Sequence, residues 1–242
     1  MINKSIHNKY FYIWNLSTGY KVPRFYIYLT QYLVLSTLYF IQKMLLPYFQ
    51  ENTIEAGLDE VGRGCLAGPV VAAAVILPAD FDIPLLNDSK KLSESKRNAL
   101  VDEIKNQALA WHVSEVSHTK IDEINILNAS FLAMHQALNE LLIIPELLLV
   151  DGNRFTKYKN IPHQCIVKGD GKYASIAAAS ILAKVYRDGL MAQLHKQYPY
   201  YAWNKNVGYP TKLHREGIKK HGPCEWHRMS FTLLPIQTEL FE

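Results

Sequence analysis

Four acidic residues stand out because each ends a predicted apolar element or lies on a predicted helix face. Asp59 and Glu60 close one apolar segment, Asp151 follows the apolar run 147–150, and Asp188 lies in an alanine-rich stretch. Adjacent carboxylates near a buried strand are costly unless a cation holds them. Each acid alone is readily explained as a solvated strand end or a salt-bridge partner. Converging from separate elements, the four predict a site for divalent cations.

The chemical type of the ligands indicates which metal ion would bind and which reaction it would support. Carboxylate oxygens without paired histidines or cysteines suit Mg²⁺ or Mn²⁺ rather than zinc. Two such ions, about 4 Å apart, can activate water and stabilise the leaving oxygen in phosphodiester cleavage. His221, Cys224 and His227 are closely spaced, but no fourth ligand stands near them in the sequence, which argues against zinc. The acids therefore indicate metal-dependent phosphodiester hydrolysis.

A glycine-rich turn follows the first two acids. Gly62, Arg63 and Gly64 begin a match to the dinucleotide-binding pattern G-x-G-x-x-A. That pattern needs a helix to begin at the turn, to present its N-terminus to pyrophosphate. Here Gly-Pro and a β-branched run follow instead, and the two preceding carboxylates would repel a pyrophosphate. We interpret the turn as one whose backbone and arginine approach a sugar–phosphate backbone closely.

Alternating strand and helix patterns must position these residues. Ser180, Lys184 and Asp188 are spaced by four residues, so they share one face of a predicted helix. Short apolar or alternating runs predict strands over 54–60, 70–77, 111–116, 147–150 and 165–167. Capping residues and three-to-four spacing predict helices over 93–107, 119–142, 173–197 and 211–220. The interleaved order indicates an α/β domain, and the aromatic residues 198–203 are interpreted as a packed loop.

Composition separates the first 43 residues from the rest. The chain has 242 residues, 49% of them apolar, which is enough for a sizeable core and argues against global disorder. The net charge of +4 includes +5 from residues 1–43, which contain no acid, so the remainder is −1. Nucleic-acid affinity must therefore come from local patches. Three scattered cysteines indicate a reducing compartment.

The N-terminal segment has three possible explanations. Residues 25–42 contain no charge and reach the length of a membrane-spanning helix, but several polar residues dilute them. The segment could be an anchor, a packed amphipathic helix, or sequence outside the natural protein. We favour a true translation start at Met44, because that residue leads directly into the first predicted strand and acidic residues begin only after it.

Six motifs carry a family resemblance. In chain order they are DEVGRG (59–64), NDSKKLS (87–93), VDG (150–152), VKGD (167–170), AASILAKVYRD (178–188) and GYPT (208–211). In sequence and order they resemble bacterial ribonuclease HII, from about residue 44 to about residue 234. The resemblance implies an RNase H-like α/β fold, with a central mixed β-sheet flanked by helices and a small C-terminal helical extension. We expect an N-terminal extension over 1–43, a catalytic domain over 44–198, and the C-terminal helical extension and tail over 199–242.

The resemblance also implies roles for individual residues. It assigns the two-metal catalytic site, with Mg²⁺ or Mn²⁺, to Asp59, Glu60, Asp151 and Asp188. It assigns recognition of the ribose 2′-hydroxyl at an RNA–DNA junction to the turn of Gly62, Arg63 and Gly64. This fits the chemistry, since that hydroxyl distinguishes RNA from DNA. Stacking on the junction sugar is implied for Tyr209, and phosphate contacts are implied for Lys90, Lys168 and Lys184.

The implied activity is cleavage of the RNA strand of RNA–DNA hybrids and nicking 5′ of ribonucleotides embedded in duplex DNA. An RNase H-fold DNA resolvase or transposase would use similar acids without depending on a 2′-hydroxyl. A non-catalytic, membrane-tethered nucleic-acid-binding protein would use residues 25–42 as its anchor. We expect a cytoplasmic monomer with no membrane contact unless that segment is genuine. The tail 235–241 vaguely resembles a peptide that binds a sliding clamp.

Overall fold

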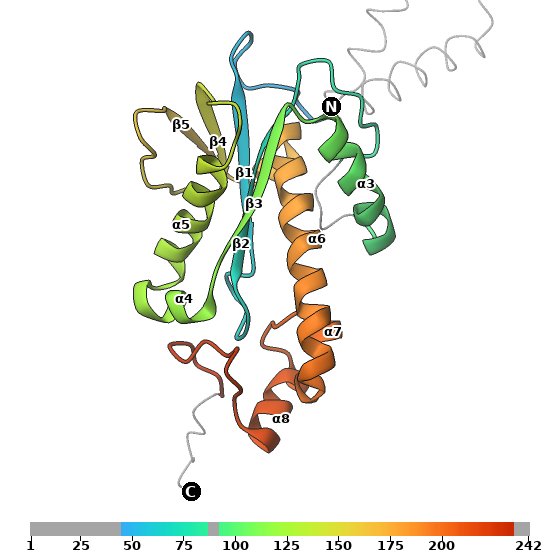
Figure 1. The fold of residues 1–242 in the computed structure, drawn as a ribbon, viewed down its shortest axis with the longest axis vertical. Coiled ribbons are helices and arrows are strands. Elements are labelled where there is room, and N and C mark those ends of the chain that lie inside the picture. The colour runs from blue at the N-terminus through green and yellow to red at the C-terminus, as the bar shows by residue number, and fades with distance from the viewer. Residues whose placement is uncertain (1–44, 87–91, 235–242) are drawn as a thin grey trace, which may run out of the picture. The chain divides into compact units, whose positions relative to one another are not determined.

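The computed structural model describes residues 45–86 and 92–234 (Figure 1). From Leu45 onward the chain forms one compact unit. Three sets of predictions fall outside the described residues: the segment 1–43 with its apolar stretch, Lys90, and the tail 235–241. The expected boundary near residue 198 stays a prediction.

A five-stranded mixed sheet forms the centre of the unit. Its strands are β1 (Glu55–Val61), β2 (Val70–Ile76), β3 (Ala110–Val116), β4 (Leu147–Asp151) and β5 (His163–Ile166). They lie in the order β3-β2-β1-β4-β5. The β3-β2-β1 half is antiparallel, whereas β4 and β5 run parallel to β1. The five predicted strands are thereby confirmed, with ends shifted by a few residues.

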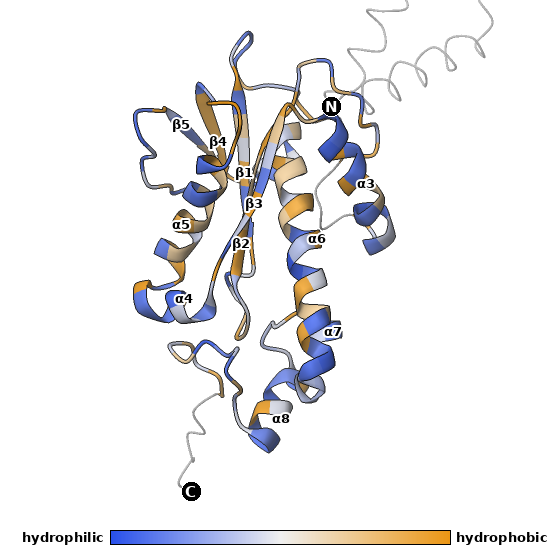
Figure 2. Cartoon of the chain, in the orientation of Figure 1, coloured by the Kyte–Doolittle hydropathy of each residue, from blue (hydrophilic) through white to orange (hydrophobic). Residues whose placement is uncertain are grey.

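Helices cover both faces of this sheet. One face is covered by α5 (Ile126–Asn139), and the other by α6 (Ala174–Gln197) and α3 (Glu94–Gln107), as Figure 1 shows. Strand β2 is buried along its whole length because both its faces are covered. Its even-numbered residues pack in the α5 core and its odd-numbered residues in the α6 core, as the two-residue repeat of a strand requires. In Figure 2 the apolar colouring is most continuous on β4 and β2, whereas the edge strands β3 and β5 are mixed.

Helix α6 approaches β1 closely because of one glycine. A Cβ at Gly57 would lie 2.2 Å from the backbone carbon of Ser175, so a larger residue would push the helix away. The strand and the helix also run in the same direction. Gly57 is level with Ser175, Asp59 hydrogen-bonds to Ser180, and a Cβ at Gly62 would meet Arg187. The alanine-rich helix therefore lies along the strand that carries the first two acids.

One predicted helix is wrong. The region expected as a single helix over 119–142 forms α4 (His118–Ile124) and α5, separated at Asn125. Asn125 has a φ of 67°, and its side chain accepts hydrogen bonds from the amides of Leu127 and Asn128. Asparagine adopts a positive φ more readily than most residues and caps helices well, so it ends one helix and begins the next.

A small helical extension follows α6. It contains a 3₁₀ turn, η3 (Pro199–Tyr201), and two helices, α7 (Trp203–Asn206) and α8 (Lys212–His221). Tyr201 and Trp203 are buried but Tyr200 is exposed, so the predicted packed aromatic loop is confirmed only in part. The predicted basic helix is confirmed as α8, which Thr211 caps. Among the described residues, no helix has the length and apolar character needed to cross a membrane.

Candidate active site

Two of the predicted acids lie side by side at the ends of neighbouring parallel strands. Leu58 pairs with Val150, so Asp59 and Asp151 are the next residues along β1 and β4. Asp59 pairs across the sheet with Ala73, which packs in the α6 core, so Asp59 points toward α6. Asp151 Oδ1 accepts a hydrogen bond of 2.6 Å from the amide of Gly169. The parallel pairing thus brings together acids that are 92 residues apart.

Asp59 lies in an environment that disfavours its charge. The residue is only 6% exposed, and burial raises its pKa well above the usual value. The carboxylates of Glu60 and Asp151 raise this pKa further, whereas a hydrogen bond from Ser180 lowers it. Asp170, in the 3₁₀ turn η2 (Gly169–Gly171), is also buried and adds to the repulsion. We call Asp59, Glu60, Asp151 and Asp170 the acidic site.

Glu60 has a partial counter-charge in the neighbouring turn. Its Oε1 accepts a hydrogen bond of 3.0 Å from Arg63 Nη1. Burial raises the pKa of Glu60, while the Arg63 guanidinium opposes that rise. Half of the Arg63 side chain is exposed, so the arginine can also reach a ligand in solvent. The turn is therefore electrostatically coupled to the acidic site.

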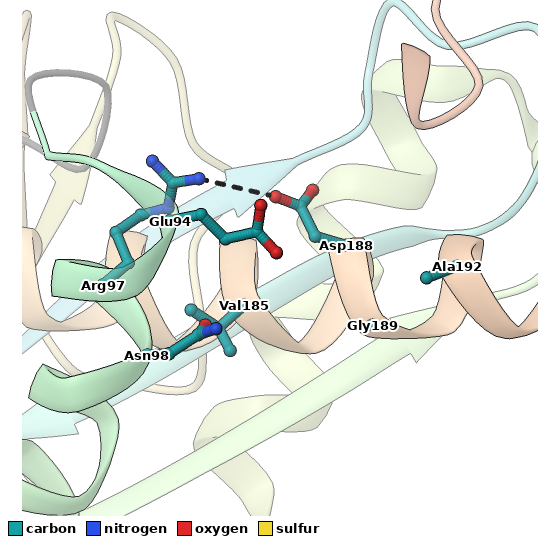
Figure 3. Close-up of a pocket in the computed structure, with 7 residues that line it drawn as sticks. All are labelled: Glu94, Arg97, Asn98, Val185, Asp188, Gly189 and Ala192. Carbon is teal, nitrogen blue, oxygen red and sulfur yellow. Dashed lines mark ion pairs between the residues drawn. The ribbon is translucent and has the colours of Figure 1, made fainter. Parts of the chain in front are cut away.

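Asp188 is ion-paired with cations in this structure. Lys184 Nζ lies 2.7 and 2.6 Å from its two carboxylate oxygens. Arg97 Nη2, on α3, lies 3.9 Å from Oδ2. The close-up in Figure 3 shows Arg97 and Asp188 facing one another across a pocket of about 270 Å³ between α3 and α6. The spacing of Lys184 and Asp188 on one helix face, predicted from sequence, is confirmed.

The acidic site has donor chemistry that suits a divalent cation. No three acidic, histidine or cysteine side chains within 45–86 and 92–234 are close enough together to hold a metal ion as they stand. The oxygen donors nevertheless suit a hard divalent ion, and Asp59 is buried among like charges that such an ion would neutralise. Asp188 could join as a ligand once Lys184 moves away, because both lie on the α6 face that carries Ser180.

The predicted substrate-binding residues differ in how they lie relative to this site. A Cβ at Gly64 would lie 3.7 Å from Tyr209 Cε1, so the turn and the half-exposed tyrosine are neighbours. Lys168 is exposed and directly precedes Gly169, whose amide binds Asp151. Lys184 is ion-paired with Asp188, and Lys90 lies outside the described residues.

Two residues near the acids were not selected from the sequence. Asp170 belongs to the VKGD motif, and its position just after a strand end was an available signal. Arg97 gave no local signal, because a single arginine on the first turns of a helix is usually solvated. Its proximity to Asp188 depends on how α3 packs against α6.

Comparison with known proteins identifies the family. The model described as Ribonuclease HII matches residues 56–234. The chain belongs to the ribonuclease HII family. Ribonuclease HII of Phocaeicola vulgatus is 62% identical over 197 residues, covering 81% of this chain and 98% of the relative. That of Bacteroides thetaiotaomicron is 63% identical over 191 residues, covering 79% and 96%. Members of this family are metal-dependent endoribonucleases that act on RNA–DNA hybrids, and neither the resolvase nor the non-catalytic alternative is favoured.

Solved structures agree with this assignment. The ribonuclease H2 of Pyrococcus horikoshii has a TM-score of 0.60 and 27% identity, covering 74% of this chain and 94% of its own. The RNase HII in a PCNA:RNase HII complex from Archaeoglobus fulgidus has a TM-score of 0.61 and 28% identity. The match covers 75% of this chain and 96% of that one. The RNase H-like fold expected from the motifs is thus confirmed.

Proposed function

We propose that the chain nicks duplex DNA on the 5′ side of embedded ribonucleotides, with Asp59, Glu60, Asp151 and Asp188 holding two Mg²⁺ or Mn²⁺ ions. The observation that carries this proposal is the position of Asp59. It is buried beside Glu60 and Asp151, and three residues before the turn that can contact a sugar. A cation and a ribose would therefore meet within one short segment.

In this proposal, some residues bind the cations and others position the substrate. The two ions, when bound, supply a nucleophilic water and stabilise the leaving oxygen. The carboxylates of Asp59 and Asp151 hold that charge in place because Ser180 and the amide of Gly169 fix their side chains. Water attacks the phosphorus and the bond to the 3′ oxygen breaks, leaving a 3′-hydroxyl and a 5′-phosphate. Lys168 and Lys184 lie where cations can bind neighbouring phosphates.

The substrate is selected at the turn. Backbone groups of Gly62 and Gly64 can approach a ribose without a side chain between them, and Arg63 can reach the adjacent phosphate. Tyr209 lies beside Gly64 and is 41% exposed, as a residue that stacks on a sugar must be. The 2′-hydroxyl is the group that such a site can use to separate RNA from DNA.

Two duplexes of identical sequence, differing in one 2′-hydroxyl, test this function. With Mg²⁺ we expect a nick 5′ of the ribonucleotide and no cut in the all-DNA duplex, and EDTA should prevent cleavage. End analysis should show a 3′-hydroxyl and a 5′-phosphate. Equal cutting of both duplexes would favour a resolvase-like enzyme and contradict the proposal.

The cellular setting is part of the proposal. We place the enzyme in the cytoplasm, as its scattered free cysteines suggest, and we take it to be a monomer because no heptad pattern in the sequence suggests assembly. A contact between a sliding clamp and residues 235–241 is supported by the PCNA complex formed by the Archaeoglobus fulgidus relative. Deletion of residues 235–242 should weaken clamp binding in a pull-down, and unchanged binding would end this idea.

A further inference from the structure

Two arginines are completely buried next to the turn, with no carboxylate of the described residues within salt-bridge distance. Arg187, on α6, and Arg228, in the C-terminal extension, are both 0% exposed. Among the described residues, five hydrogen bonds from the two guanidinium groups go to backbone carbonyls, and Arg187 also bonds to the Cys65 thiol. Burying a charge that is not ion-paired is expensive. Packing alone is therefore a poor explanation for two such residues.

Arg187 joins two loops. Its Nε and Nη2 donate to the carbonyls of Pro69 and Ala67, at 2.9 and 3.0 Å. Its Nη1 donates to the carbonyl of Val207, at 2.7 Å, two residues before Tyr209. A Cβ at Gly62 would lie 2.2 Å from Arg187 Nε, so the turn rests directly on this guanidinium. One side chain thus sets the distance between the turn and the tyrosine loop.

Arg228 holds the turn from the other side. Its Nη1 donates to the carbonyl of Arg63 at 3.0 Å, and its Nε donates to that of Gly68 at 2.9 Å. Its Nη2 is buried and finds no acceptor in the described part of the chain. An unsatisfied buried donor costs free energy, so stability alone does not account for an arginine at this position.

A pair of buried histidines completes the connection to Tyr209. His214 Nδ1 lies 2.9 Å from the carbonyl of Tyr209, and its Nε2 lies 3.2 Å from Nε2 of His227. His227 directly precedes Arg228, whose amide donates to the carbonyl of Leu66. A continuous buried polar network therefore runs from the backbone of Tyr209 to the backbone of Arg63.

We propose that Arg187, Arg228, His214 and His227 form a buried frame that fixes the 62–64 turn relative to Tyr209 and so sets the preference for a single ribonucleotide junction. These four are positioning residues, because none of them touches substrate. The inference rests on the proposed function, in which the turn and Tyr209 contact the junction. Discrimination by one hydroxyl depends on distances between these groups, and a rigid supporting network is what keeps such distances constant.

The test uses Arg187→Lys and Arg228→Lys in the full chain. Each lysine keeps the charge but cannot reach carbonyls on two segments at once. The ratio to measure is kcat/KM for a duplex with one ribonucleotide over kcat/KM for a uniform RNA–DNA hybrid. We expect this ratio to fall about tenfold to a hundredfold, as small misplacements do. The dissociation constant for Mn²⁺ should stay within about twofold, since the frame does not touch the acids.

The control is Tyr198→Phe, which loosens the same extension without changing the charge around Arg228. The Tyr198 hydroxyl donates a hydrogen bond to Glu225 Oε1, which this substitution removes. The control variant should leave the ratio unchanged. Amide hydrogen exchange verifies folding: the lysine variants should exchange faster at Leu66 and Gly68, with the β1–β2 ladder still protected. If Arg187→Lys fails to fold, the ratio measured for Arg228→Lys tests the proposal.

Two negative results have separate meanings. Folded lysine variants with the wild-type ratio, or an equal loss in Tyr198→Phe, would overturn the frame. A wild-type enzyme that shows no preference for the single ribonucleotide would instead overturn the proposed role of the turn and Tyr209.

Discussion

The acidic site and the buried frame lie on either side of the Gly62–Gly64 turn and handle buried charge in opposite ways. In the acidic site, burial and neighbouring carboxylates raise the pKa of Asp59 and of Glu60, and Arg63 opposes the rise only at Glu60. In the frame, two guanidinium groups are bound by five backbone carbonyls of the protein itself. The charges of the acidic site would thus be balanced by a bound cation, whereas the guanidinium groups of the frame are hydrogen-bonded within the protein. We infer that the first binds cations and the second holds geometry.

Neutralising the central carboxylate should give the largest effect. Asp59→Asn removes charge from the middle of the acidic site, so cleavage should fall by at least about a thousandfold, because metal ions contribute several kcal/mol to such reactions. Single-turnover assays with Mg²⁺ measure the loss. Asp102→Asn, on the exposed face of α3, is the matched control and should cleave normally. An active Asp59→Asn enzyme would show that the acidic site is not catalytic.

Removing the aromatic ring on the frame side should have a smaller and more selective effect. Tyr209→Ala should reduce cleavage at a single ribonucleotide about tenfold, since a stacking ring contributes about 1–3 kcal/mol. Mn²⁺ affinity should not change. Tyr200→Ala is the control, because Tyr200 is exposed and stacks on His221 instead. Equal losses in both variants would mean that Tyr209 has no special position.

The acidic site should also reduce stability when no metal is bound. Because burial raises the pKa of Asp59, its ionisation opposes folding, and that cost grows as pH rises above the unfolded value of 3.8. Metal-free Asp59→Asn should therefore be more stable than wild type at pH 7, by on the order of 1 kcal/mol. The difference should vanish near pH 4. Urea unfolding in EDTA measures it, and a less stable variant at pH 7 would contradict this account.

The buried frame should contribute to stability with the opposite pH dependence to Asp59. This is the smallest of the predicted effects. Burial and the neighbouring His214 lower the pKa of His227 from 6.5 to about 4. Between these two pH values His227 is therefore neutral in the folded protein and protonated in the unfolded chain. Stability from this group is present above pH 6.5 and is lost as pH falls toward 4. His227→Asn should make the urea midpoint less dependent on pH between 7 and 5. Parallel curves for the two proteins would argue against a neutral histidine pair.

Local signals in the sequence marked Asp59, Glu60 and Asp151 of the acidic site, and Asp188 on α6, but not Asp170. Strand ends mark Asp59 and Asp151, and a four-residue spacing links Lys184 to Asp188. The parallel pairing of β1 with β4 then brings the strand ends together, as parallel strands in an α/β fold do. The same local logic failed at Asn125, because the apolar periodicity continues through a residue that in fact caps a new helix.

The frame could not be predicted in this way. Arg63 and Arg228 are separated by 165 residues, and an arginine in a basic C-terminal segment is normally interpreted as solvated. Burial of Arg228 depends on how the extension packs against residues 66–68, which no periodic pattern encodes. Arg187 lies inside a recognised motif, but its three carbonyl partners come from two distant loops.

A crystal structure with Mn²⁺ tests the central claim most directly. The account predicts anomalous density bound by Asp59, Glu60 and Asp151, with Lys184 Nζ moved away from Asp188 and the Arg187 and Arg228 contacts unchanged. Mn²⁺ bound elsewhere, with the ion pair between Lys184 and Asp188 intact, would contradict it.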